Sequence, residues 1–329
     1  MLVKACPKIE GRAARNNQKR TFLMTDSQFA SGGYRYALNP IQWFATEDGW
    51  LDPAKGPAPQ DLLKEIAHSG FHAVHAQVPA GWTTEDYQNA LKDAGLQPAP
   101  GYLSMALPEH GVDIATTLET ARTSAAQQAQ LGLTDMFIAT RMTKDAPRVK
   151  RPGVGAEFDE ARFVMIFDLV ERASAILKEE GVKAALHPHI GTWIESEAET
   201  RRLLDNISSD QLGFGPDTGH LSWAGADVIG LISDYRDRTR VVHVKDCRLS
   251  VRDAAKADGK SYQETVVSGL WAEPGTGELD LEGMLAALGP DFDGWLIAEV
   301  DFPTLPPFEC AQASAEWLAD LRRPLPSSR

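Results

Sequence analysis

AALHPHIGT (residues 184–192), LGFGPDTGH (residues 212–220) and RVVHVKD (residues 240–246) are three short segments that begin mostly with apolar residues and end in groups able to bind a metal. A fourth segment of the same kind, GWLIAEVD, covers residues 294–301. A divalent metal needs three or four His, Asp or Glu side chains that converge on one point. Parallel strands that follow one another and each end in such a residue would supply this set. We therefore expect an enzyme built as a barrel of such strands.

The same alternation of strand and helix extends through most of the chain. Apolar patterns and turn residues predict strands at 34–40, 72–79, 96–103, 135–139, 182–186, 212–215, 241–244 and 295–300. Helices are predicted around 62–67, 84–94, 113–131, 158–180, 197–206, 226–235, 281–288 and 308–321. Residues 246–278 are predicted to form a long excursion from this alternation. Several of these helices stop at a glycine just before the next strand (Gly70, Gly95, Gly132, Gly181). Strict alternation implies parallel strands, and eight units predict a closed (βα)8 barrel, the TIM barrel.

An open, doubly wound sheet is the competing fold. Such a sheet normally carries a glycine-rich phosphate loop after its first strand, whereas Asn39-Pro-Ile-Gln-Trp43 stands at that place here. In the barrel, the active site lies at the C-terminal ends of the strands. The candidate ligands all fall at such ends, on the predicted fifth to eighth strands: His187, Asp217, His243 and Glu299. This shared position supports the barrel more strongly than any single motif.

Length and composition fit one catalytic domain. The chain has 329 residues, of which 43% are hydrophobic and 24% charged. No stretch approaches the roughly 18 consecutive apolar residues that a membrane span requires, and no apolar signal region begins the chain. We therefore expect a cytoplasmic protein. The three cysteines, Cys6, Cys247 and Cys310, share no metal spacing and suggest reduced thiols.

The net charge of −13 argues against a nucleic-acid ligand, because phosphate contacts need clustered Lys and Arg. Residues 1–33 carry six basic and two acidic groups, so their net charge is +4 and the remainder carries −17. We expect residues 1–33 to be a flexible basic extension, residues 34–322 the catalytic barrel and residues 323–329 a C-terminal tail. A targeting or binding arm is the alternative for the first segment, and Met24 could be the natural start.

Each candidate residue has a structural role as its alternative. His187 and His189 are two residues apart on an extended segment and so face the same way. We expect His187 to bind the metal and His189 to contact the substrate, although one of them could be a hydrogen-bonded core histidine. Asp217 stands where a metal ligand would, but an aspartate there could simply cap the next turn. His220, three residues on, could orient the ligands or move protons.

The last two strands supply the remaining catalytic candidates. His243 and Lys245 share one face of their strand, and polar side chains that face a barrel interior need partners. The alternative is that Lys245 extends outward to solvent. Glu299 lies inside an apolar strand, where an unpaired carboxylate is costly, so a role as metal ligand or base is favoured. Asp301, two residues further on, lies on the same face of the strand and would support Glu299.

Other polar and aromatic residues could also reach the substrate. Trp43 lies on the loop after the first strand and could stack on a sugar ring, although a tryptophan is more often core packing. We also expect Arg248 to contact the substrate. A basic cluster in the loop after the fourth strand is consistent with a solvated loop or with anion binding: Lys144, Arg148, Lys150 and Arg151.

These motifs resemble those of the xylose-isomerase-like TIM barrels, the sugar phosphate isomerases and epimerases, and are most similar to the inosose (2-keto-myo-inositol) dehydratases. The resemblance covers about residues 35–322 and depends on five stretches: 39–43, 187–192, 217–220, 243–246 and 294–299. It implies one divalent metal, Mn²⁺ first, with Co²⁺, Mg²⁺ and Zn²⁺ as alternatives. The implied ligands are His187, Asp217, His243 and Glu299.

The sequence departs from the relatives at two positions. Epimerases of this group usually carry a glutamate where His187 stands, and they use two glutamates, one on each face of the substrate. A symmetric two-glutamate epimerisation is therefore in doubt. The dehydratases usually have a glutamate where Gln77 ends the second strand, which leaves the substrate open.

The expected reaction begins with removal of a proton next to a ketone. A metal on the ketone oxygen acidifies that proton, and Glu299, His220 or Lys245 would remove it. Loss of a β-hydroxyl as water completes a dehydration, so we expect a metal-dependent lyase acting on a keto-cyclitol or keto-sugar. The alternatives are a sugar or ketose isomerase or epimerase, a lyase that cleaves 3-keto-glycosides including C-glycosides, and a non-catalytic sugar-binding partner subunit. We expect a small-molecule substrate, no nucleic acid or membrane, and a homo-oligomer; a partner subunit that completes the site is an alternative.

Overall fold

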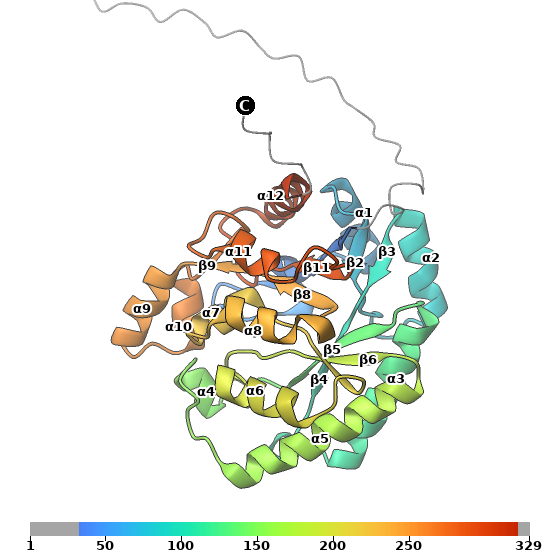
Figure 1. Ribbon diagram of the computed structural model, residues 1–329. Helices are drawn as coiled ribbons and strands as arrows, with labels where there is room; N and C mark the ends of the chain where they lie inside the picture. The colour runs from blue at the N-terminus through green and yellow to red at the C-terminus, as the bar shows by residue number, and fades with distance from the viewer. Residues whose placement is uncertain (1–32, 322–329) are drawn as a thin grey trace, which may run out of the picture. The chain divides into compact units, whose positions relative to one another are not determined.

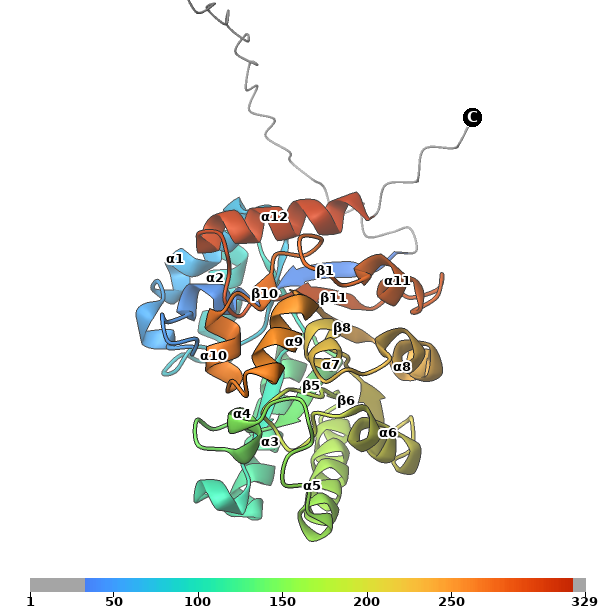
Figure 2. The same ribbon diagram turned by 90° about the vertical axis from the view of Figure 1, so that its left-hand side faces the viewer.

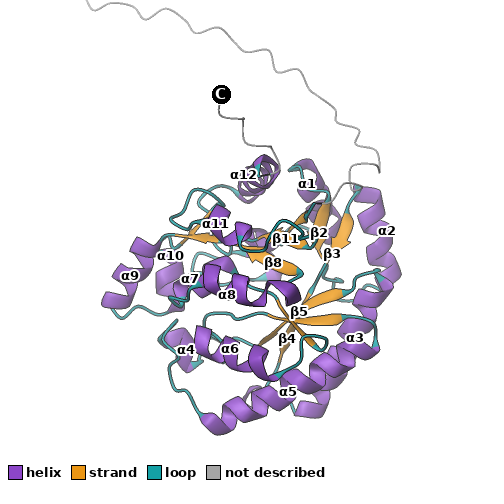
Figure 3. Ribbon diagram, in the orientation of Figure 1, coloured by secondary structure: helices purple, strands orange, loops and turns teal. Residues whose placement is uncertain are grey.

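The computed structural model describes residues 33–321, in which parallel strands form the centre and helices surround them (Figure 1, Figure 3). One ladder has the order β3-β2-β1-β11-β8 and the other β4-β5-β6-β7. The strands are β1 Arg35–Leu38, β2 Ala73–His75, β3 Gln97–Ala99, β4 Tyr102–Met105, β5 Asp135–Thr140, β6 Lys183–Leu186, β7 Leu212–Phe214, β8 Val241–Val244 and β11 Trp295–Ala298. All pairs within the two ladders are parallel, as strict alternation predicts.

Two seams join the ladders into the predicted (βα)8 TIM barrel. At the first seam, isolated parallel bridges connect Phe214 with Thr239 and Asp217 with His243, so the end of β7 meets β8. At the second seam, β3 runs directly into β4. The predicted single strand at 96–103 is therefore two strands, and its second half extends to Met105.

The break between β3 and β4 has a local cause at Pro100 and Gly101. Proline has no N–H to donate to a ladder. The N–H of Gly101 donates to the side-chain oxygen of Gln128 at 2.9 Å. A Cβ on Gly101 would lie 2.5 Å from the carbonyl oxygen of Ala76, so only glycine fits this close approach of two backbones.

The outer helices follow one another around the strands, as Figure 1 shows. They are α1 Pro59–His68, α2 Thr84–Ala94, α3 Ile114–Gln130, α5 Glu160–Glu179, α6 Glu197–Asn206, α8 Val228–Tyr235, α11 Leu281–Ala286 and α12 Pro307–Asp320. Their apolar faces pack on the strands because each helix repeats buried residues at helical spacing, as in α5. The predicted glycine stops are confirmed, since Gly70, Gly95, Gly132 and Gly181 all have positive φ angles.

Several short elements were not predicted. The helix α7 Thr218–Trp223 begins directly after Asp217, and α4 Pro147–Lys150 lies in the loop after β5. The excursion at 246–278 contains a short antiparallel pair of strands, β9 Asp246–Cys247 with β10 Trp271–Ala272, and between them the helices α9 Leu249–Ala257 and α10 Tyr262–Val267. All six residues of α7 are buried, so it has no solvent-exposed face and gives no amphipathic pattern in the sequence. Short 3-10 turns lie at Pro40–Phe44, Pro53–Lys55, Pro108–His110 and Arg236–Arg238.

The short elements gather on one side of the barrel. Figure 2 shows α4, α7, α9 and α10 together on this face, where the loops after β5, β7 and β8 meet. Among residues 33–321, no helix is long and apolar enough to cross a membrane. Almost all of the predicted basic extension and the whole predicted tail at 323–329 lie outside the described residues.

Candidate metal centre

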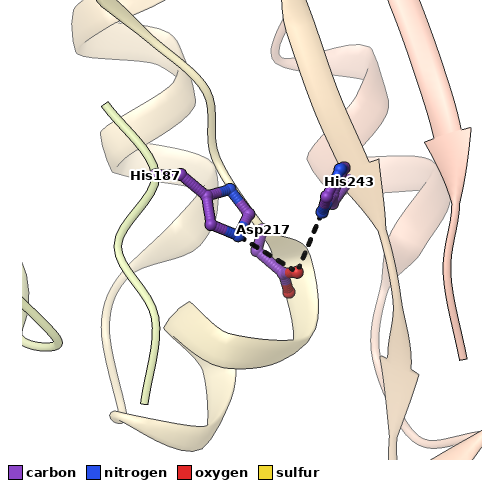
Figure 4. Close-up of side chains that lie close together, drawn as sticks. All are labelled: His187, Asp217 and His243. Carbon is purple, nitrogen blue, oxygen red and sulfur yellow. Dashed lines mark ion pairs between the residues drawn. The ribbon is translucent and has the colours of Figure 1, made fainter. Parts of the chain in front are cut away.

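Three side chains from adjacent parts of the barrel lie close together (Figure 4). His187 follows β6, Asp217 follows β7 and His243 lies in β8. Asp217 is fully buried, and both imidazoles are 1% exposed. The Oδ2 atom of Asp217 is 3.9 Å from Nε2 of His187 and 3.8 Å from Nδ1 of His243. One ligand atom of each residue lies within 4.8 Å of the others, a spacing that suits a single cation.

Several atoms of this group are buried without a hydrogen-bond partner among residues 33–321. Nδ1 of His187 must donate to the carbonyl oxygen of Gly215, at 3.0 Å, so its Nε2 carries the lone pair. That Nε2, Oδ2 of Asp217 and both ring nitrogens of His243 have no hydrogen-bond partner. A buried polar atom without a partner is destabilising unless something satisfies it. The residues present therefore fit a divalent metal.

Glu299 joins this group from the end of β11. One carboxylate oxygen, Oε2, lies 3.1 Å from Nδ1 of His243, without the geometry of a hydrogen bond, and accepts a hydrogen bond from the amide of Asn39. The other, Oε1, is 2.5 Å from Nζ of Lys245. A second set of ligand atoms within 4.8 Å of one another comprises Asp217, His220 and Glu299. The four predicted ligands thus converge, with His220 as a further neighbour of the same point.

Lys245 lies at the centre of the acidic groups and is fully buried. Its Nζ is 2.8 Å from Oδ2 of Asp301 and 3.6 Å from Oδ2 of Asp217. Lys245 therefore points into the barrel, and the alternative of an outward lysine is wrong. Burial opposes its charge, but the carboxylates of Asp217, Asp301 and Glu299 outweigh burial and raise the pKa of Lys245 well above its usual value. The ammonium keeps its protons and acts as a hydrogen-bond donor.

His220 is a neutral imidazole next to this ammonium, and the neutral ring of His189 packs against it. Their ring centroids are 3.7 Å apart. Nε2 of His220 is 3.0 Å from Nζ of Lys245 and must accept, because an ammonium can only donate. Burial lowers the pKa of His220 well below its usual value and lowers the pKa of His189 to about 4. Both rings are therefore uncharged near neutral pH, and Nδ1 of His220 carries the ring proton.

The three carboxyl groups around Lys245 differ in their pKa values. Burial raises the pKa of Asp217 to about 7 and the pKa of Asp301 to about 6, despite the nearby Lys245. Burial also opposes the charge of Glu299, but attraction to His243 and Lys245 outweighs it and lowers the pKa of that carboxyl. Titratable groups with pKa values pushed apart in one buried site are typical of acid–base catalysis.

Two predicted substrate contacts are engaged elsewhere. Nε1 of Trp43 donates to Oε2 of Glu65 on α1 at 2.7 Å. Nη1 of Arg248 donates to the carbonyl oxygens of Gly269 and Trp271, at 3.0 and 2.8 Å, and so braces the excursion. The structure gives both side chains structural partners and does not join them to the buried cluster.

Other residues of the site had no role as metal ligand or catalytic residue in the sequence analysis. His75 ends β2, with its ring centroid 5.3 Å from that of His243 and its Nε2 without a partner among the described residues. Burial lowers its pKa to about 4. Trp271 covers the site, with its ring 5.1 Å from His220 and Nζ of Lys245 4.8 Å from its centroid. Asn39 could have been recognised as a polar residue directly after the first strand; a lone histidine such as His75 carries no such signal.

Comparisons with known proteins identify sequence relatives. The chain matches a family model described as xylose isomerase-like TIM barrel over residues 63–321. An inosose dehydratase of Geobacillus thermodenitrificans is 24% identical over 300 residues, which cover 89% of this chain and 98% of the relative. The rhizopine catabolism protein MocC of Rhizobium meliloti is 28% identical over 273 residues, which cover 81% of each chain.

Solved structures share the fold. The crystal structure of IOLI protein with a binding zinc atom has a TM-score of 0.64 and 14% identity, and the match covers 87% of this chain and 97% of that one. The probable 3-DHS dehydratase AsbF from Bacillus anthracis has a TM-score of 0.60 and 17% identity, with 87% and 98% covered. At these identities the likeness concerns the fold alone. The family model spans well over half of the sequence, and the chain therefore belongs to the xylose isomerase-like TIM barrel family.

Proposed function

We propose that this enzyme, which is of the sugar isomerase, epimerase and dehydratase type, is a metal-dependent lyase that removes water from a keto-cyclitol or keto-sugar. The observation that carries the proposal is the set of buried atoms without partners on His187, Asp217 and His243. The names of the relatives support dehydration as the type of reaction, since the matched proteins include inosose dehydratases.

His187, Asp217, His243 and Glu299 would hold one divalent metal. Two imidazole nitrogens and two carboxylates suit Mn²⁺, Co²⁺ or Zn²⁺, and we propose Mn²⁺. When bound, the metal supplies a Lewis acid that polarises the carbonyl oxygen of the substrate.

The remaining residues of the site move protons and bind oxygen atoms. His220 would remove the proton next to the carbonyl through its Nε2 atom, once Lys245 donates to the substrate instead of to this nitrogen; Glu299 is the second candidate. Lys245 keeps its charge and donates hydrogen bonds to the oxygen on which negative charge develops. Asp301 holds Lys245 in place through their 2.8 Å contact, and the proton taken up by the base is returned to the departing hydroxyl, which leaves as water.

The proposal is tested on full-length protein purified without chelator. We expect bound divalent metal, and with Mn²⁺ we expect inosose to give an ultraviolet-absorbing dione while ketohexoses remain unchanged. His187→Ala should lose metal and lower kcat/KM by at least about 100-fold, since it removes a ligand. His72→Ala, an exposed histidine replaced in the same way, is the matched control.

Each other outcome points to a named alternative. Full metal content and activity in His187→Ala would contradict the proposed set of metal ligands. Interconversion of ketohexoses without a new absorbance would identify an isomerase or epimerase, and release of an aglycone from a 3-keto-glycoside would identify a glycoside-cleaving lyase. Intact sugar binding without metal would identify a non-catalytic binding protein.

A further inference from the structure

The loops on the catalytic side of the barrel form a second, basic cavity away from the buried cluster. Its volume is about 260 Å³. We propose that this cavity binds a phosphoryl group of a small molecule, and we name it the cationic pocket after its charged lining residues: Lys150, Arg151, Arg252, Lys256 and Lys260. This inference goes beyond the proposed function, because a keto-cyclitol is uncharged.

The cationic pocket lies between two segments that are far apart in the sequence. One wall is the end of α4 with the turn at 151–154, and the other is formed by α9, α10 and the turn between them. Trp223 of α7 lies between them and contributes an aromatic surface. Figure 2 shows these elements on the same face of the barrel.

Positive charge in this pocket is not neutralised by its lining. The lining residues other than the five cations are uncharged. Arg252 pairs with Asp253 at 2.7 Å, but among residues 33–321 the side chains of Lys150, Arg151 and Lys256 have no ion pair or hydrogen bond. In a chain of net charge −13, such a concentration of unpaired cations requires an explanation.

The spacing of the cations increases their mutual repulsion. Arg252, Lys256 and Lys260 are four residues apart, so the first two are neighbours on one face of α9, and like charges at this spacing repel. An anion between the two walls would remove this repulsion. A phosphoryl group suits the set because it has several acceptor oxygens and up to two negative charges for the Arg fork and the Lys ammonium groups.

Hydrogen bonds fix the walls of the pocket, while Lys150, Arg151 and Lys256 remain exposed. Arg148, in α4, forms a buried two-point pair with Glu199, at 3.0 and 2.6 Å. The carboxylate of Glu195 accepts hydrogen bonds from the N–H groups of Gly153 and Gly155. On the other wall, Arg252 donates to the carbonyl oxygen of Ser222 at 2.8 Å. A site whose walls are already ordered loses less entropy when it binds.

Aromatic contacts connect this pocket with the buried cluster. The ring of Trp223 is 5.6 Å from that of Trp271, which in turn is 5.1 Å from His220. Trp223 and Trp271 thus separate the cationic pocket from the candidate metal centre. An anion bound in the pocket would hold the segment 246–278, which carries Trp271, in place.

The test is a calorimetric titration of the full chain with inorganic phosphate, pyrophosphate and glucose 6-phosphate, in a buffer without other multivalent anions. We expect saturable binding with one site per chain. The triple variant Lys150→Gln, Arg151→Gln, Lys256→Gln should bind at least about tenfold more weakly, because it loses charge-assisted hydrogen bonds. Lys92→Gln, an exposed lysine on α2, is the matched control and should bind as the wild type does.

Two further measurements separate this pocket from other sources of binding. Binding should persist after treatment with chelator, which excludes phosphate held by a metal in the buried cluster. Without anion, the triple variant should unfold at the same or a higher temperature than the wild type, because repulsion is relieved; a variant that unfolds earlier is replaced by Lys256→Gln alone.

The probes also distinguish the source of the phosphoryl group. Tighter binding of glucose 6-phosphate assigns a phosphate ester, and equal or tighter binding of the inorganic ions assigns free phosphate or pyrophosphate. The proposal is overturned if none of the three probes saturates one site, or if the triple variant binds them as tightly as the wild type.

Discussion

The positive charge of Lys245 compensates the negative charges of the carboxylates in the buried cluster. Its fully buried ammonium faces the carboxylates of Glu299, Asp301 and Asp217. Lys245→Met would leave these groups uncompensated, so we expect the free energy of unfolding to fall by about 3–5 kcal/mol. Urea denaturation in the presence of a chelator measures this, with Lys92→Met as the exposed control. A loss below about 1 kcal/mol would mean that the ammonium does not balance the carboxylates.

Asp217 makes the affinity for metal depend on pH. Burial raises its pKa to about 7, so the carboxyl is protonated below pH 7 and must lose that proton to bind a cation. The pKa of His243 is lowered to about 3, so this imidazole stays neutral and releases none. Metal affinity should therefore fall as the pH falls through 7, by about tenfold per unit.

Proton release provides the measurement for Asp217. Calorimetric titration with Mn²⁺ in two buffers of different ionisation enthalpy should detect about one proton released at pH 6 and almost none at pH 8. Equal release at the two values would show that another group supplies the proton.

Residues of the site differ in how far the sequence could predict them. His187, Asp217, His243 and Glu299 each end an apolar strand, and the barrel rule brings such ends together. His75 also ends a strand, but its neighbour Gln77 supplies no second acidic or imidazole group that would mark a metal site. The pairing of Lys245 with three acids was beyond prediction, because it depends on distances across three strands.

At the level of elements, a single carboxylate holds several loops of the catalytic face. Glu195 accepts hydrogen bonds from the N–H groups of Gly153, Gly155 and Gly191. Glu195→Ala should destabilise the fold by about 1–3 kcal/mol, since buried donors lose their acceptor. Hydrogen exchange should accelerate at these glycine amides, whereas Glu171→Ala on the exposed face of α5 should leave them unchanged. Unaltered exchange in Glu195→Ala would show that other contacts order these turns.

The long helices could be predicted from their apolar patterns, whereas the short elements could not. The amphipathic helices α1, α2 and α5 repeat apolar residues over several turns, so their positions were predicted within a few residues. The break at Gly101 and the fully buried α7 depend on contacts with distant parts of the chain, which no local pattern contains.

At the level of the whole barrel, the proposed metal would connect the two ladders. His187 and Asp217 belong to the ladder of β4 to β7, whereas His243 and Glu299 belong to the other. At a metal concentration of 100 Kd we expect stabilisation of about 2.7 kcal/mol, reversed by chelator. Hydrogen exchange should slow most at the isolated bridges between β7 and β8. Asp217→Asn is the control, and uniform protection of all strands would contradict a bond across this seam.

The division of the strands also sets an order of assembly. The ladder from β4 to β7 comes from one continuous stretch, residues 102–214, whereas β1 to β3 complete their sheet with β8 and β11 from the far end of the chain. Pairings between neighbours in sequence form sooner than those that close long loops. During synthesis on the ribosome, the middle of this polypeptide can therefore acquire structure while the first three strands still wait for the last two, and the metal ligands meet only after Glu299 has been translated.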